Sequence, residues 1–468
     1  MSTLTPARSL ALKVTRQVRE RTAYAHNLIE AQVRNAPTPP EERAFAILLI
    51  LGVVQSRGTL DTIIDRALAN PHDIKADVRD ALRVSAYELV FLGKGTHAAV
   101  DQGVELVRSI APRAAGLANK VLRSIAADKN GFPWGDPAAD AAALARLHAF
   151  PLWLATRLIA SLGHEAAATF MAASNEQAPL YLARTKGGTK GDGSSVLPSV
   201  LRIPNSELPA YLPGIEAGEY LVVDASAQEV ARIATPPAQG AFLEVGSGRG
   251  TKTVLLQGNA LRSHGHQVPL IALDQHAFKA QILLKRIAQY GLENVKPVTG
   301  DVLALDALIA QGVVPASLAG ALIDAPCSGT GTLRRHPEIR WNLAAKDVTA
   351  MAHNGLAMLN AVAPHLAPGG FMVYATCSVL AEENEHVIEA FLKSAAGAAF
   401  WLQPLNAGSE GTAASPSSRP QPPSACSKAA AASAARTGSS AAKGPYFKAV
   451  LEPGGPDAHF AAKLVRRA

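Results

Sequence analysis

Cysteine is scarce in this sequence. Its 468 residues include three, Cys327, Cys377 and Cys426, and their spacing is not that of a metal site. So few cysteines exclude a disulfide framework, and we expect no zinc or other bound metal. Free thiols persist in reducing compartments, so we expect a cytoplasmic protein.

Long apolar runs are missing, and so is a leader sequence. The longest apolar run, residues 44–54, is far shorter than the roughly 20 residues that span a bilayer. Residues 3–21 mix charged with apolar side chains, without the continuous apolar core of a signal peptide. We therefore expect no membrane partner.

Acidic residues are outnumbered, with 38 Asp and Glu against 45 Lys and Arg, for a formal charge of +7. This balance favours an anionic partner. The length predicts two or three domains. Within residues 6–130, apolar residues recur every three or four positions, which predicts helices almost throughout and an all-helical domain over residues 1–135. Residues 1–130 hold 18 Lys and Arg against 13 Asp and Glu, so this domain carries most of the excess positive charge.

Two further regions follow the helical domain. Residues 136–238 have a weaker pattern, which predicts linker helices and a small subdomain facing the substrate. Residues 239–468 form the third predicted domain. It contains a low-complexity stretch at 406–444, rich in Ala, Ser, Pro and Gly, which we expect to be a disordered insertion. Cys426 lies in this stretch, and we assign it no function.

In the third domain, apolar strands alternate with helical segments. This alternation predicts an α/β fold, a doubly wound Rossmann-like sheet with helices on both faces. Ligands of such sheets bind beyond the carboxyl ends of the strands. Cys327 and Cys377 each stand just past the end of a predicted strand. The predicted strands are residues 241–245, 268–273, 295–298, 318–323 and 371–375.

A glycine loop follows the first strand and leads into a helix. The residues of interest there are Glu244, Gly246, Ser247, Gly248, Arg249, Gly250, Thr251 and Lys252. Thr251 stands where both a dinucleotide fingerprint and a P-loop require glycine. The near match to a P-loop, with Asp324 as a metal-binding acid, leaves a nucleotide hydrolase as an alternative. S-adenosylmethionine is the third candidate, because its sites use an acid-led glycine loop with further acids after the second and third strands.

Acids do stand at those places, Asp274 after the second strand and Asp301 after the third. Three acids at successive strand ends suit one ligand lying along the edge of the sheet. Each acid could instead cap the helix that follows it.

Two thiols at strand ends suit the chemistry of cytosine. A thiolate that adds to C6 makes C5 nucleophilic, and a second thiol can assist the later release. Asp324, three residues before Cys327, is placed to hydrogen-bond the base. Neighbouring strands lie roughly 4.8 Å apart, so Cys327 and Cys377 would face one substrate if their strands are adjacent. Alternatively, both are buried structural cysteines.

Two motifs surround these cysteines, Asp-Ala-Pro-Cys-Ser-Gly-Thr-Gly at 324–331 followed by Arg-Arg-His-Pro-Glu, and Tyr-Ala-Thr-Cys-Ser-Val at 374–379 followed by Glu-Glu-Asn-Glu. They resemble the Sun/NOL/NOP family of RNA 5-methylcytosine methyltransferases. Phrases between residues 7 and 123, such as His-Ala-Ala-Val-Asp-Gln at 97–102, resemble the NusB-like RNA-binding domain. The combination is similar to the group of bacterial 16S ribosomal-RNA methyltransferases B.

The resemblance implies S-adenosylmethionine-dependent methylation of cytosine C5 in RNA, with small-subunit ribosomal RNA as partner. It implies that Cys377 is the nucleophile and that Cys327 aids product release, with Asp324 holding the base. We expect Arg334, Arg335 and the helical domain to hold RNA phosphates, and we expect a monomer. The cofactor would be held by the glycine loop with Glu244, Asp274, Asp301 and Asp324.

The glycine loop departs from the family. Where the family usually has Cys-Ala-Ala-Pro-Gly-Gly-Lys-Thr, this chain has Gly-Ser-Gly-Arg-Gly-Thr-Lys-Thr at 246–253. A non-catalytic NusB-like RNA-binding or transcription factor is the other alternative, suggested by the helical domain alone. That reading predicts RNA binding without cofactor binding.

Overall fold

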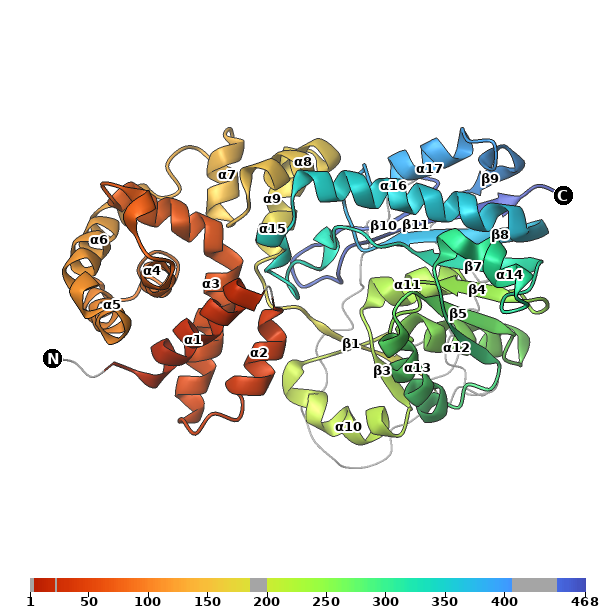
Figure 1. The fold of residues 1–468 in the computed structure, drawn as a ribbon, viewed down its shortest axis with the longest axis horizontal. Helices are drawn as coiled ribbons and strands as arrows, with labels where there is room; N and C mark the ends of the chain where they lie inside the picture. The colour runs from red at the N-terminus through yellow and green to blue at the C-terminus, as the bar shows by residue number, and fades with distance from the viewer. Residues whose placement is uncertain (1–3, 22, 186–199, 406–443) are drawn as a thin grey trace, which may run out of the picture.

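The computed structural model describes residues 4–21, 23–185, 200–405 and 444–468. Cys426 and all of the predicted low-complexity stretch except Gly444 lie outside the described residues. A helical bundle forms one end of the molecule and a sheet flanked by helices forms the other (Figure 1).

The helical bundle is built around one long helix. That helix, α3, packs against α1, α4 and α6, and its Leu49, Ile50, Leu60 and Ile64 are buried in the core. The prediction of helices almost throughout residues 6–130 is confirmed. The bundle comprises α1 (Pro6–Arg21), α2 (Ala25–Gln32), α3 (Pro40–Ala67), α4 (Ala76–Val90), α5 (Thr96–Ile110) and α6 (Ala115–Asp128).

Among the described residues, α3 is the one helix long and apolar enough to suit a membrane span as well. More than half of its apolar stretch is buried inside the protein. The core of the bundle therefore accounts for its apolar character.

Three helices and a small sheet connect the bundle to the large sheet. The helices α7 (Ala141–Leu147), α8 (Leu152–Leu162) and α9 (His164–Ala173) pack through Leu154 and Phe170 onto Leu333 and Leu380 of the sheet domain. An antiparallel sheet in the order β2-β1-β3 follows. Its strands are β1 (Leu180–Arg184), β2 (Val200–Ile203) and β3 (Tyr220–Val222), and helix α10 (Leu208–Glu216) connects β2 to β3.

The large sheet has the strand order β10-β11-β8-β7-β4-β5-β6, and β9 also pairs with β11. The five strands from β4 to β8 run parallel, as predicted for a doubly wound fold, whereas β9, β10 and β11 are antiparallel to their partners. The strands are β4 (Phe242–Val245), β5 (Leu270–Asp274), β6 (Val295–Thr299), β7 (Leu318–Asp324), β8 (Leu366–Thr376), β9 (Phe400–Gln403), β10 (Phe447–Ala449) and β11 (His459–Arg466).

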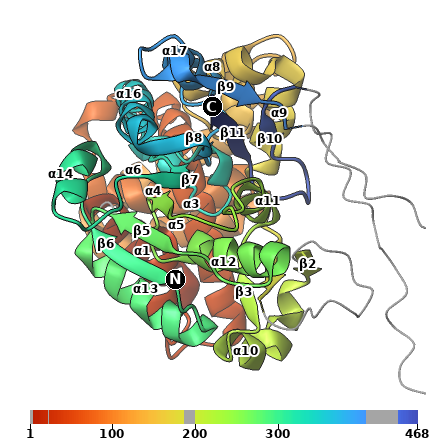
Figure 2. The ribbon, with the colours of Figure 1, turned by 90° about the vertical axis from the view of Figure 1, so that its right-hand side faces the viewer.

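Helices cover both faces of this sheet (Figure 2). Alternate residues of β7 pack on opposite faces of the sheet. Ile323 packs with α16, and Leu322 packs with α11 and α12. Burial on both faces explains why the central strands β4, β5 and β7 are apolar along most of their length. The helices are α11 (Ala225–Ile233), α12 (Thr251–His264) and α13 (Ala277–Tyr290) on one face, and α14 (Leu305–Ala310), α16 (Ala345–Val362) and α17 (Glu385–Leu392) on the other.

The bundle docks on the segment that follows Cys327. Trp341, in the short helix α15 (Ile339–Asn342), donates a hydrogen bond from Nε1 to the carbonyl oxygen of Gln55 at 2.6 Å. Arg57 Nη2 donates to the carbonyl oxygen of Trp341 at 3.0 Å. Gly58 leaves room for the indole ring, because a Cβ there would lie 2.1 Å from it. Helix α3 therefore contacts a segment that is continuous with the cysteine loop.

Candidate active site

The cysteines lie side by side at the carboxyl ends of two paired strands. In the parallel pair β7 and β8, Asp324 lies opposite Ala375, and Ala325 donates a backbone hydrogen bond to the carbonyl oxygen of Ala375 at 2.9 Å. The Sγ atoms of Cys327 and Cys377 are 3.5 Å apart, and both residues are partly exposed. Adjacent strands thus bring the two thiols together.

The two thiols differ in acidity. A hydrogen bond from the Cys327 thiol lowers the pKa of Cys377, and the positive charge of Lys252 acts in the same direction against burial and nearby acids. The hydrogen bond to Cys377, together with burial, raises the pKa of Cys327 well above its ordinary value. Because the thiolate is the nucleophilic form, Cys377 is the better placed of the two to attack a substrate.

A lysine and an aspartate from different elements form an ion pair next to the thiols. Lys252 lies in the first turn of α12, and its Nζ donates to Asp324 Oδ2 at 2.6 Å. Burial alone would lower the pKa of Lys252, but the charge of Asp324 and its hydrogen bond raise it. The lysine that suggested a P-loop is therefore charged and bound to Asp324.

A buried polar network supports the two cysteine loops from beneath. Glu383 accepts hydrogen bonds from the backbone nitrogen of Ser328 at 2.7 Å and from its hydroxyl at 2.6 Å. Ser378 Oγ lies 3.2 Å from Ser328 Oγ, and Asn384 Nδ2 donates to the carbonyl oxygen of Ser378 at 2.9 Å. Burial raises the pKa of Glu383. Sequence analysis included Glu383 and Asn384 in a motif but assigned them no role.

Three glycines shape the loop after β4. Gly246, Gly248 and Gly250 have φ values of 76°, 57° and 83°, in the left-handed region that favours glycine. A Cβ on Gly246 would lie 2.5 Å from the carbonyl oxygen of Asp324, and one on Gly250 would lie 2.4 Å from Leu283. At Gly248, by contrast, the nearest atom would be 3.8 Å away. The loop is tightly packed on its inner side and open at Gly248.

The three strand-end acids have different surroundings. Glu244 is buried beneath the loop, where it accepts a hydrogen bond from Thr253 at 2.6 Å, and burial raises its pKa to about 8. Asp274 accepts hydrogen bonds from the backbone nitrogen of Gly248 at 3.0 Å and from Lys279 at 3.2 Å. Asp301 is exposed and accepts a hydrogen bond from the Leu303 backbone nitrogen at 2.9 Å.

Asp274 is held in its charged form. Burial alone would raise its pKa, but hydrogen bonds from the His276 backbone, Lys279 and the Gly248 backbone outweigh that effect and lower it. Asp274 accepts its loop hydrogen bond from the backbone of Gly248, whereas Glu244 accepts from the side chain of Thr253. The Asp274 carboxylate therefore lies at the open part of that loop.

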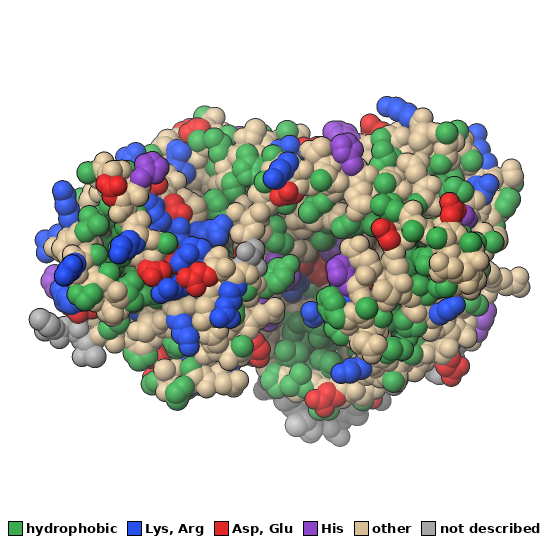
Figure 3. All heavy atoms as spheres, viewed as in Figure 1, with side chains coloured by type: hydrophobic (Ala, Val, Ile, Leu, Met, Phe, Trp, Pro, Cys, Tyr) green, Lys and Arg blue, Asp and Glu red, His purple; other side chains and the backbone are tan. Residues whose placement is uncertain are grey.

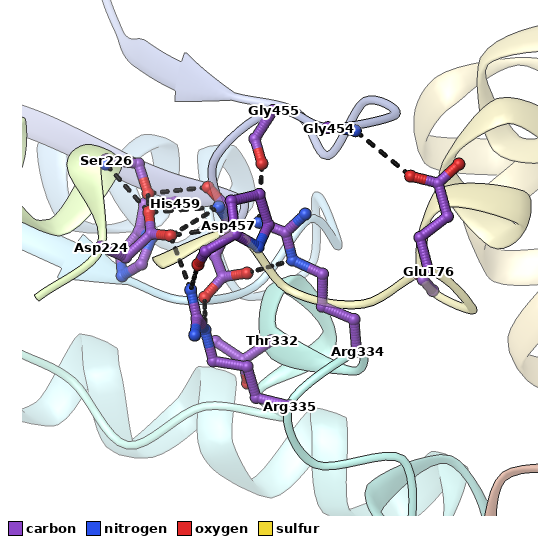
Figure 4. A network of polar contacts seen from close by, with 12 residues as sticks. Glu176, Asp224, Ser226, Thr332, Arg334, Arg335, Gly454, Gly455, Asp457 and His459 are labelled. Carbon is purple, nitrogen blue, oxygen red and sulfur yellow. Dashed lines mark hydrogen bonds and ion pairs between the residues drawn. The ribbon is translucent and has the colours of Figure 1, made fainter. Parts of the chain in front are cut away.

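The prediction that Arg334 and Arg335 hold phosphates is wrong for Arg334. Its side chain is fully buried, and its Nε donates to Asp457 Oδ1 at 2.6 Å (Figure 4). Arg335 pairs with Asp457 as well, and its Nη2 donates to Asp224 Oδ2 at 3.1 Å. Both arginines are used to neutralise buried carboxylates. Sequence analysis did not identify Asp457 as their partner.

Basic side chains gather instead over the helical bundle, and the face between bundle and sheet domain is hollowed (Figure 3). A groove along α1 is lined by Lys13, Arg16 and Arg21, with Asp77 and Glu20 at its side. Arg16 is partly neutralised by both of those acids.

Comparison with known proteins agrees with this architecture. A family model described as 16S rRNA methyltransferase RsmB/F matches residues 231–424, and a NusB family model matches residues 5–127. Rv1407 of Mycobacterium tuberculosis, named as a methyltransferase, is 30% identical over 397 residues, which cover 80% of this chain and 84% of the relative.

A second relative and one solved structure extend over more of the chain. The crystal structure of PH0851 matches with a TM-score of 0.69 and 19% identity over 99% of each chain, which shows a shared fold. The ribosomal RNA small subunit methyltransferase B of Escherichia fergusonii is 30% identical over 415 residues, which cover 84% of this chain and 91% of the relative. With this identity over most of both chains, the protein belongs to the RsmB/F family of 16S rRNA methyltransferases.

Proposed function

We propose that this protein methylates C5 of a cytosine in small-subunit (16S) ribosomal RNA, with S-adenosylmethionine as cofactor and a covalent bond between Cys377 and C6 of the base. The observation that carries the proposal is the pair of thiols, 3.5 Å apart, beside the Lys252–Asp324 ion pair. Two thiols of opposite pKa shift suit a reaction in which one sulfur must bond to the base and then leave it.

Each residue has a task in this mechanism. The Cys377 thiolate attacks C6, and the electron pair of the C5–C6 double bond moves toward C5 and the base ring. Asp324, a carboxylate paired with Lys252, accepts a hydrogen bond from the amino group at the base edge and so holds the base against the thiols. At the end of the reaction the Cys377–C6 bond breaks, and the Cys327 thiol donates a hydrogen bond to the departing thiolate. Its raised pKa keeps Cys327 protonated for that role.

The glycine loop fits the cofactor. When bound, S-adenosylmethionine supplies an electrophilic methyl group. Gly248 leaves open space where a side chain would stand, and the charged Asp274 beside it offers an acceptor for hydroxyl groups. The residues proposed to hold the cofactor are Glu244, Gly246, Ser247, Gly248, Arg249, Gly250, Thr251, Lys252, Asp274, Asp301 and Asp324. Glu244 would act indirectly, through Thr253 at the start of α12.

The helical bundle would hold the RNA. Lys13, Arg16 and Arg21 lie along one groove of its surface and would contact phosphates, which position an RNA without reading its sequence. The target base has to leave its stack, because the thiols lie between loops of the sheet domain. We propose that the protein acts as a monomer in the reducing cytoplasm, where both thiols stay free.

The test compares the wild type with Cys377→Ala and Cys327→Ala. Each protein is incubated with ribosomal RNA and methyl-labelled S-adenosylmethionine, and the products are separated by denaturing gel and nucleoside analysis. The wild type should form 5-methylcytosine, Cys377→Ala should form neither product nor adduct, and Cys327→Ala should accumulate a covalent protein–RNA species. Cys426→Ala is the matched control and should behave as wild type.

Two results would overturn the proposal. If Cys377→Ala methylates as well as wild type, the nucleophile is another group. If no protein binds S-adenosylmethionine while ATP or GTP is hydrolysed with magnesium, the glycine loop is a nucleotide site. RNA binding without cofactor binding would instead favour a non-catalytic RNA-binding factor.

A further inference from the structure

His459 is held close to Cys377 by the backbone. It is the first residue of β11, where Phe460 pairs with Thr376, the residue before Cys377. Gly331 connects the two segments, since its nitrogen donates to the carbonyl oxygen of Cys377 at 2.8 Å and its carbonyl oxygen accepts from Ala458 at 3.1 Å. His459 therefore borders the site of covalent bond formation.

The hydrogen bonds of Ser226 determine which nitrogen of His459 carries the proton. Ser226 Oγ lies 2.7 Å from Asp224 Oδ1, from the Asp457 carbonyl oxygen and from His459 Nδ1 (Figure 4). The hydroxyl has one hydrogen, and its two oxygen neighbours are acceptors. We assign the hydroxyl hydrogen to one of these oxygens, which makes Nδ1 the donor to Ser226. In the neutral ring this leaves Nε2 with a free lone pair.

Burial and the charge of Lys252 keep the ring neutral. Burial lowers the pKa of His459, and the positive charge of Lys252 lowers it further. Asp224, Asp457 and Asp324 act in the opposite direction but do not reverse the shift. Asp457 and Asp224 are in turn neutralised by ion pairs with Arg334, which is buried, and with Arg335, which is partly exposed. A neutral imidazole with a free Nε2 is a proton acceptor.

The proposed reaction needs such an acceptor. Once C5 carries the methyl group, its original proton must leave before Cys377 can be expelled. Cys377 is then bonded to C6, Cys327 is a protonated thiol, and Asp324 is occupied by Lys252 and the base edge. In the part of the chain that the structure describes, the His459 ring makes its one side-chain hydrogen bond to Ser226, through Nδ1.

We propose that Nε2 of His459 takes the C5 proton from the covalent adduct, a role that rests on the proposed function. The C5–H bond breaks and its proton goes to Nε2. The electron pair of that bond forms the C5–C6 double bond, and the electrons of the C6–Sγ bond return to Cys377 as thiolate. Ser226 and Asp224 hold the ring and stabilise the imidazolium that forms.

The test is single turnover of His459→Gln on RNA that carries tritium or deuterium at cytosine C5. Tritium release should slow by about 100-fold, the order expected for losing a general base, while a methyl-labelled covalent adduct forms within threefold of the wild-type rate. The deuterium isotope effect on release should rise in His459→Gln but not in Cys327→Ala, where sulfur expulsion is slow instead. His365→Gln, at the opposite end of β8, is the matched control.

The pH profile separates a base from a structural residue. The rate of tritium release by the wild type should fall as the pH drops through the pKa of His459. The rate for His459→Gln should not show this fall. Tritium release at the wild-type rate in His459→Gln, or an equal loss of adduct formation and release, would overturn the proposal. A wild type that releases no tritium and forms no 5-methylcytosine would show instead that the proposed function itself is wrong.

Discussion

Replacement of Glu244 by Gln should change how stability depends on pH. Glu244 is 1% exposed at the end of β4, and burial raises its pKa to about 8, from 4.5 for an ordinary glutamate. Between these two values the folded protein holds a proton that the unfolded chain has released. The stabilisation is therefore complete below pH 4.5 and is lost as the pH rises to about 8.

The pKa difference limits the size of the effect. A gap between 4.5 and about 8, at roughly 1.4 kcal/mol for each pH unit, corresponds to at most about 5 kcal/mol. Gln has nearly the same shape and keeps an oxygen that accepts the hydrogen bond from Thr253, but it does not ionise. Glu244→Gln should therefore resemble the wild type at low pH and exceed it in stability above pH 8.

Thermal and urea unfolding of both proteins between pH 5 and 9 provide the measurement. The difference in unfolding free energy between the variant and wild type isolates Glu244 from other titrating groups. Glu293→Gln, which removes an exposed carboxyl group, serves as the control for the loss of one charge. A flat difference for Glu244→Gln would show that Glu244 ionises normally, and would refute the assignment of a protonated acid beneath the glycine loop.

Three further predictions concern single contacts. Gly58→Ala should weaken the docking of the bundle, although Ala usually stabilises a helix over Gly by about 1 kcal/mol, because its Cβ would lie 2.1 Å from the Trp341 ring. In a Trp341→Ala background the same change should stabilise, and additive effects in this unfolding cycle would contradict the contact. Arg334→Leu should cost at most about 3–5 kcal/mol in urea unfolding, because Asp457 loses its fully buried partner and keeps only the partly exposed Arg335; a weaker salt dependence of RNA binding would instead indicate a phosphate contact. Gly248→Ala should lower S-adenosylmethionine affinity about tenfold, or roughly 1.4 kcal/mol, because its Cβ would occupy the open space beside Asp274, and unchanged affinity by calorimetry would argue against cofactor binding at this loop.

The meeting of the two cysteines was largely predictable from sequence. Each motif follows an apolar strand, and parallel strands end at one edge of a sheet, so Cys327 and Cys377 were expected at the same edge. Sequence does not give the order of strands within the sheet. The 3.5 Å contact depends on β8 lying directly beside β7, with Asp324 opposite Ala375.

The ion pairs of Arg334 and Arg335 with buried carboxylates were not predictable from the sequence. Arg334 and Arg335 stand in a polar segment, which usually indicates exposure. Their partners Asp457 and Asp224 are 122 and 111 residues away from Arg335 in the chain. Burial of a charge depends on such distant partners, and local composition carries no signal of them. The local sequence pattern also did not predict that β11 runs antiparallel to β8, the direction that brings Asp457 to this place.

Gly331 is another residue whose surroundings depend on distant parts of the chain and not on local composition. In the sequence, the Gly-Thr-Gly segment at 329–331 is a run of small residues after Cys327 and carries no sign of close packing. In the structure a Cβ on Gly331 would lie 2.2 Å from the Ala458 carbonyl oxygen and 2.8 Å from that of Cys377. Glycine is required here by close packing of three backbones, because any side chain would push β11 away from Cys377. The segment that supplies Cys327 is thus locked to both Cys377 and the start of β11, and the site depends on that packing for its geometry.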